Sequence, residues 1–217
     1  MESRSTFNRY NTTQLFERST GINHKTHYLP DQIPNQGTAV VAYDGYLYYA
    51  RRSAGVLVKF DYHNNETIMT RKLHDDIGFG GVFAYSGSRD SSWDLEVDET
   101  GLWMIYSTYE NQGFIMLGKL NTTSLEFERT WTGNFPKNKL GNCFVISGVL
   151  YCVSSHSSPA ARINYYLDTN TGEEGFMSVP FNVKYGNLNS LKYNPYNQKL
   201  YAIDDGLAVV YDLIFGY

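Results

Sequence analysis

A hairpin-like block recurs along the chain about every fifty residues, and this repeat restricts the fold more than any other feature. In each block a short apolar strand is followed by a turn and then by an aromatic-rich strand built around one leucine. The clearest copy is DLEVDETGLWMIY at residues 94–106, with its turn at residues 98–101. Self-similarity at such a period is typical of repeat architectures. The equivalent leucines, separated by 55, 48 and 50 positions, are Leu47, Leu102, Leu150 and Leu200.

Each block continues into a third strand, and three blocks continue into a fourth, at residues 67–73, 126–131 and 176–181. Four short antiparallel strands repeated in this way predict the blades of a β-propeller. Upstream, residues 13–19 and 25–29 are predicted to be the outer strands of an earlier blade whose inner pair we do not recognise. The sequence therefore predicts an all-β fold with four blades and about half of another. We expect residues 1–12 to be a poorly ordered arm and residues 13–217 to form the propeller domain.

Composition and charge exclude several classes of protein. Aromatic residues make up 16% of the chain, with 19 Tyr, and aromatic side chains favour strands. A formal net charge of −4 with scattered signs gives no basic stripe for a nucleic acid. The apolar runs are far too short to span a membrane. The first ten residues contain no apolar core, so we identify no signal peptide in the sequence as written.

Six blocks in a fixed order resemble the olfactomedin domain, an extracellular five-bladed β-propeller. The resemblance implies a non-enzymatic module in extracellular matrix, cell-adhesion or signalling proteins. It also implies a disulfide that this chain lacks, because Ser147 stands where one of its cysteines would be. The blocks are GTAVVAYDGYLYYA (37–50), DLEVDETGLWMIYST (94–108), LNTTSLEFERTW (120–131), GNCFVISGVLY (141–151), YYLDTNTG (165–172) and YNPYNQKLYAIDDG (193–206).

The resemblance also implies a calcium ion in the central channel. Its ligands would be the side chains of Asp94 and Asn142, the carbonyls of Cys143 and Leu191, and an aspartate where this chain has Lys192. Carboxylates strongly tune calcium affinity, and an ammonium in place of one should repel the ion. We therefore expect Lys192 to occupy the ion's place and pair with Asp94, so that no cofactor is bound. In the alternative, Lys192 points outward and a weaker calcium site survives.

The two cysteines lie at matching positions of one predicted hairpin. If Ser147 and Gly148 form a two-residue turn, Cys143 lies opposite Cys152, with the two Cα atoms about 4.5 Å apart. That geometry permits a disulfide. We nevertheless expect two buried free thiols, because a longer turn would break the register and the redox compartment is not known from the sequence.

No catalytic set emerges from the remaining chemistry-bearing residues. Of five histidines, only His24 and His27 lie close together, and the run 154–156, Ser-Ser-His, has no orienting third group. Three sequons predict N-glycosylation at Asn11, Asn65 and Asn121.

The predicted function is binding of another extracellular or cell-surface protein, without nucleic-acid binding or membrane insertion. Loop-borne aromatic residues are the candidate contacts, because aromatics anchor interfaces. Secretion is expected from the resemblance. Two alternatives remain: a truncated isoform that interferes with a full-length partner, and a propeller hydrolase or lyase with its active site over the channel. The candidate contacts are Phe79, Phe83, Tyr85 and Tyr109.

Overall fold

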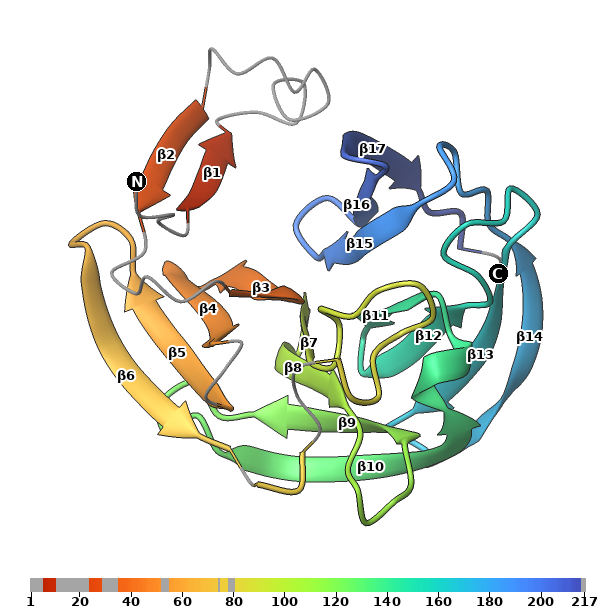
Figure 1. Ribbon diagram of the computed structural model, residues 1–217, viewed down its shortest axis with the longest axis horizontal. Coiled ribbons are helices and arrows are strands. Elements are labelled where there is room, and N and C mark those ends of the chain that lie inside the picture. The colour runs from red at the N-terminus through yellow and green to blue at the C-terminus, as the bar shows by residue number, and fades with distance from the viewer. Residues whose placement is uncertain are drawn as a thin grey trace.

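The fold is a ring of small antiparallel sheets around a central axis, as the repeat predicts (Figure 1). The computed structural model describes residues 6–10, 24–28, 35–51, 55–73, 75–77 and 81–215. Three of the sheets have four strands, one has three and one has two. Within each sheet, strands that follow one another in the chain are hydrogen-bonded neighbours. This meander confirms the prediction of an all-β propeller.

The strand boundaries follow the repeat closely. The first sheet pairs β1 (Thr6–Tyr10) with β2 (His24–Tyr28). The second contains β3 (Asn35–Tyr43), β4 (Tyr46–Arg51), β5 (Val56–Asp61) and β6 (Glu66–Lys72). The third contains β7 (Asp94–Asp98), β8 (Gly101–Tyr106), β9 (Phe114–Leu120) and β10 (Phe127–Pro136). The fourth contains β11 (Asn142–Ile146), β12 (Val149–Val153), β13 (Arg162–Asp168) and β14 (Glu174–Pro180). The last contains β15 (Leu188–Asn194), β16 (Lys199–Asp204) and β17 (Leu207–Asp212).

The N-terminal region differs in part from expectation. The segment expected as an arm, residues 1–12, includes β1, which pairs with β2. The strand predicted at residues 25–29 corresponds to β2. The strand predicted at residues 13–19 lies outside the described residues.

Neighbouring blades pack face to face, and β8 shows why its sequence is continuously apolar. Leu102 and Met104 enter the core shared with the β3–β6 sheet, whereas Trp103 and Ile105 enter the core shared with the β11–β14 sheet. Successive side chains of a strand point to opposite faces, so a strand buried on both faces shows no polar alternation. The third sheet is therefore held between the second and the fourth.

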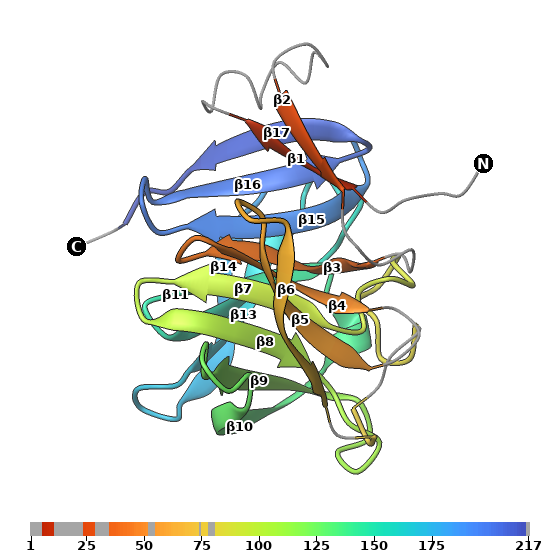
Figure 2. The ribbon, with the colours of Figure 1, turned by 90° about the vertical axis from the view of Figure 1, so that its left-hand side faces the viewer.

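The inner strands β3, β7, β11 and β15 line the axis of the ring and contact one another (Figure 1). The turns joining β3 to β4, β7 to β8, β11 to β12 and β15 to β16 lie at one end, which we call the hairpin end. Figure 2 shows this end on its left side. Side chains on the inner strands are thus brought together from segments about fifty residues apart.

Candidate functional site

The central polar cluster is built around Asp94, the first residue of β7. Its side chain is fully buried. Tyr85 Oη donates to Asp94 Oδ2 at 2.9 Å, and Lys192 Nζ donates to Asp94 Oδ1. Burial raises the pKa of Tyr85 well above its usual value, so the phenol remains a hydrogen-bond donor. Both oxygens of this buried carboxylate are therefore bound.

The Lys192 ammonium lies in a shell of four oxygens. Besides Asp94, its Nζ lies 2.6 Å from Glu96 Oε1, 2.7 Å from the Leu95 carbonyl oxygen and 2.8 Å from the Thr38 carbonyl oxygen. Its three N–H donors are therefore shared among four acceptors. Lys192 comes from β15, and its partners come from β7 and β3, so the residue ties three inner strands together. The expected pairing of Lys192 with Asp94 is confirmed.

Glu96 adds a second buried carboxyl to the cluster. It lies two residues after Asp94 on β7 and therefore on the same side of the strand. Burial raises the pKa of Glu96 well above its usual value, and Lys192 opposes this shift. Burial of Lys192 favours its neutral amine, but the attraction of Asp94 and Glu96 for the ammonium is stronger than this effect. The pKa of Lys192 is therefore raised. The net charge of Asp94, Glu96 and Lys192 together is zero when Glu96 holds a proton, because the negative charge of Asp94 then balances the positive charge of Lys192.

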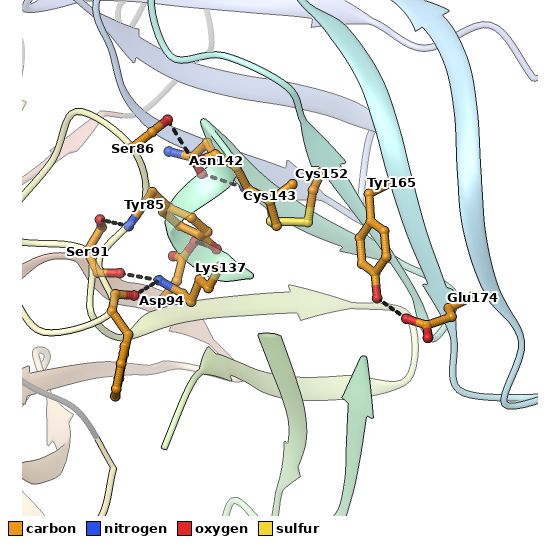
Figure 3. The surroundings of a disulfide bond; sticks show 12 residues. Tyr85, Ser86, Ser91, Asp94, Lys137, Asn142, Cys143, Cys152, Tyr165 and Glu174 are labelled. Carbon is orange, nitrogen blue, oxygen red and sulfur yellow. Dashed lines mark hydrogen bonds between the residues drawn. A yellow bond between two sulfur atoms is a disulfide. The ribbon is translucent and has the colours of Figure 1, made fainter. Parts of the chain in front are cut away.

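Lys137, which the sequence analysis missed, is a second buried cation beside this cluster. It begins the short 3-10 helix η1 (Lys137–Lys139), and its Nζ lies 3.6 Å from the centroid of the Tyr85 ring. The ammonium donates to the carbonyl of Ser91 (Figure 3). It also donates to the carbonyl of Phe83. Burial lowers the pKa of Lys137 to about 7, against the pull of Asp94. Its flanking residues, Pro136 and Asn138, are typical of a solvent-exposed loop, so no sequence signal marks it as buried.

The cysteines form a disulfide, so the expectation of free thiols is wrong. Cys143 and Cys152 are register partners, with their Cα atoms 4.1 Å apart and an S–S bond of 2.08 Å (Figure 3). The turn between them has two residues, Ser147 and Gly148, both with positive φ. Two positive φ angles match the right-handed twist of a hairpin and keep its register. The expected register is thus confirmed, and the longer turn that would have broken it does not occur.

The four aromatic residues predicted as contacts differ in exposure. Tyr85 is only 3% exposed and belongs to the central cluster, so its prediction as a surface contact is wrong. Tyr109 is 56% exposed and packs its ring edge-on against half-buried Phe83. Phe79 lies outside the described residues.

Comparison with known proteins places the chain in a family. The model of the olfactomedin-like domain matches residues 1–217. The chain belongs to the olfactomedin-like domain family. Its curated relatives include the myocilins of Felis catus (43% identical over 193 residues), Rattus norvegicus (39% over 201) and Homo sapiens (39% over 193). These alignments cover 89%, 93% and 89% of this chain. The chain spans 39% of the length of the Felis catus and Rattus norvegicus myocilins.

The similarity of this olfactomedin-like domain to solved structures supports its fold but not its function. Glutaminyl cyclase from Myxococcus xanthus superimposes with a TM-score of 0.52 at 14% identity, covering 88% of this chain and 78% of that one. The Cps50 (Swd1) beta-propeller domain of Myceliophteria thermophila gives 0.51 at 12% identity, covering 99% and 65%. At such low identity neither likeness carries information about function.

The side chains of this olfactomedin-like domain do not fit the calcium ion that the resemblance implies. The Lys192 ammonium already contacts two carboxyl groups and two carbonyls, the same oxygen types that calcium prefers. Asn142 directs its side-chain oxygen to the Cys143 amide, at 2.9 Å, and Leu191 is fully buried on β15.

The predicted glycosylation sites lie in different settings. Asn65 is exposed in the turn between β5 and β6, with a φ of 57°. Asn121 is half-buried in the turn after β9, where its Nδ2 donates to Glu128 Oε1 at 3.0 Å. Asn11 lies outside the described residues. Modification at these three residues stays a prediction.

Proposed function

We propose that this olfactomedin-like propeller is a non-enzymatic module that binds another extracellular protein at the hairpin end of its channel. The observation that carries the proposal is a groove with an exposed tyrosine on its rim. The groove has a volume of about 310 Å³ and is lined by residues of β3, β7, β15 and β16. Tyr196, in the turn after β15, is 89% exposed.

The groove has the composition of an interface anchor point. Its walls include Val40, Val97 and Tyr201, and its polar groups include Glu96 and Lys192. Aromatic residues beside a partly apolar depression are typical of the few positions that carry most of the energy of a protein–protein interface. Because Glu96 and Lys192 bind each other, they offer a partner little unpaired charge.

The same pairing argues against the hydrolase or lyase alternative. An active site over the channel would need groups free to act as nucleophile, base or acid. Asp94 and Lys192 are instead bound to each other. Within the part of the chain that the structure describes, Ser86 Oγ lies 3.5 Å from His156 Nδ1, but this hydroxyl donates to the Leu140 carbonyl at 2.9 Å. These contacts support a structural role for the two side chains.

An extracellular location is supported by two observations. Structural disulfides persist in oxidising compartments, and this chain joins Cys143 to Cys152. The chain is also similar to the myocilins over most of its length. In the described part of the chain, no helix has the length and apolar character needed to cross a membrane. We therefore propose a cell-surface or matrix protein as the partner.

A panel of purified extracellular ectodomains tests the proposal. We expect at least one to bind the immobilised wild-type domain, and Tyr196→Ser to weaken that binding at least about tenfold, as loss of an interface anchor does. Tyr109→Ser is the matched control, because Tyr109 is also exposed but lies in the loop between β8 and β9, at the other end of the ring. Equal affinities of wild type and Tyr196→Ser for every bound ectodomain would contradict the proposed groove.

A further inference from the structure

Two positive side chains lie next to each other on the third sheet, and the ion pairs of the described residues include neither of them. Lys119 on β9 is the register partner of Trp103 on one side and of Arg129 on the other. Like charges placed directly opposite in a sheet repel each other. The pair is therefore unfavourable for the isolated fold.

Both cations instead lie over indole rings. Lys119 Nζ is 5.3 Å from the ring centroid of Trp103, and Arg129 Cζ is 4.8 Å from that of Trp131. The two indoles are tilted neighbours with centroids 5.7 Å apart. Stacking of this kind orients a cation and leaves its charge uncompensated. Two oriented positive charges therefore remain available to a ligand.

One of the indoles also has a free donor. Trp103 Nε1 donates to Asp98 Oδ1 at 2.8 Å. Trp131 Nε1 is shielded from solvent but has no acceptor in the part of the chain that the structure describes. Shielded donors without an acceptor are rare and call for an explanation. A ligand oxygen beside Trp131 would supply one.

These residues line a shallow pocket between the third and fourth sheets at the hairpin end. The pocket has a volume of about 480 Å³. Its opposite wall comes from the β11–β12 and β13–β14 turns, which contribute Gly148, Thr169 and Asn170. The lining thus combines two cations, one carboxylate (Glu128), an indole N–H, hydroxyl groups and an amide. The cations outnumber the carboxylate, so the pocket suits a ligand that is rich in oxygen atoms and carries negative charge.

We propose that this pocket binds an acidic glycan, with a sulfate or carboxylate group of the sugar between Lys119 and Arg129. A sugar ring presents oxygens around its whole edge and can offer acceptors to both cations and to the Trp131 N–H. An acidic peptide side chain offers two oxygens at one point, which makes it the poorer match. The site is separate from the groove at the channel mouth, so it does not depend on the proposed protein partner.

Four probes test the assignment by calorimetry or surface binding: a heparin-derived oligosaccharide, a hyaluronan oligosaccharide, a neutral dextran oligosaccharide and a polyglutamate peptide. We expect one or both acidic oligosaccharides to bind, more weakly as salt is raised. Lys119→Gln and Arg129→Gln should each weaken binding at least about tenfold, since each removes a charge-assisted hydrogen bond. Binding of the heparin fragment alone assigns a sulfate group, and binding of both assigns a carboxylate.

Two variants serve as controls. Lys184→Gln removes a lysine that lies over the ring of Tyr185, outside the pocket, and should leave binding unchanged. Glu128→Gln removes a carboxylate that lines the pocket and should tighten binding about threefold by relieving repulsion. Arg129→Lys keeps the charge and provides a second test if Arg129→Gln does not fold.

Several results would overturn the proposal. These are failure of both acidic oligosaccharides to bind, equal loss of binding in Lys184→Gln, or weaker binding in Glu128→Gln. Equal affinity for dextran would show that charge is not recognised. Binding of polyglutamate as tightly as the glycans would assign the pocket to acidic peptides instead.

Discussion

At the scale of single residues, the central cluster shows how one lysine can pair with two buried carboxyl groups. A buried charge is tolerated only when it is paired and its other atoms are bound. Asp94 meets this condition through Lys192 and Tyr85. Glu96 meets it only in part: its Oε1 binds the same ammonium and burial raises its pKa, but its Oε2 is buried without a partner among the described residues. The cluster therefore places its own cation among oxygens from three inner strands.

Lys137 predicts a pH dependence of stability with a definite sign. Its pKa is about 7 in the folded chain and about 10.4 in an unfolded one. Between these values the unfolded chain binds more protons, so the free energy of unfolding should rise with pH, by up to about 1.4 kcal/mol per pH unit. Urea unfolding at pH 7 to 9, compared between wild type and Lys137→Met, measures this difference. A slope that is the same in both proteins would contradict the assignment to Lys137.

The residues of the cluster could be predicted to different degrees. Lys192 and Asp94 were found because the olfactomedin resemblance placed both at one site, and the charge of Lys192 then predicted their pairing. Lys137 could not be found in this way, because its burial depends on the loop carrying Phe83 and Ser91, which is distant in sequence. Tyr85 was misjudged for the same reason: a loop residue looks exposed until its partner Asp94 is placed.

At the scale of elements, the β11–β12 hairpin links register, turn and disulfide. The sequence predicted the register from the two-residue turn, and the structure confirms it. The sequence could not decide between two free thiols and a disulfide. That choice depends on whether the turn between the two strands has two residues or more. The positive φ angles of Ser147 and Gly148 provide the missing constraint.

Loss of this disulfide should lower the stability of the domain. Closing so short a loop is worth about 2–3 kcal/mol in the chain-entropy account, so Cys143→Ala with Cys152→Ala should lose about that much. Guanidinium unfolding of the wild type with and without reductant measures the same quantity and should agree with the double variant. Two reactive thiols in the unfolded, unreduced wild type would show instead that the bond does not form.

At the scale of the whole molecule, the fold was predictable because it is repeated. Four hairpins at a constant period specified the blades, and β8 is buried on both sides as its uninterrupted apolar sequence requires. The period of the repeat does not specify which side chains or ions fill the central channel. The contents of the channel depend on single substitutions such as Lys192, and they decide whether the ring needs an added ion.

Lys192→Asp provides the matching variant for that question. It restores the carboxylate that the resemblance implies and removes the competing ammonium, leaving Asp94, Asn142 and the carbonyls of Cys143 and Leu191 as oxygen donors. We expect the unfolding midpoint of this variant to rise with calcium, because an ion that binds only the folded state stabilises it.

Thermal unfolding of the wild-type chain, in excess calcium and in excess chelator, tests the central claim most directly. Our account predicts the same midpoint in both, because the Lys192 ammonium holds the place of the ion. An ion at one hundred times its dissociation constant would add about 2.7 kcal/mol, which raises the midpoint by roughly 5–10 °C in a domain of this size. A calcium-dependent rise of that magnitude in the wild type would contradict it.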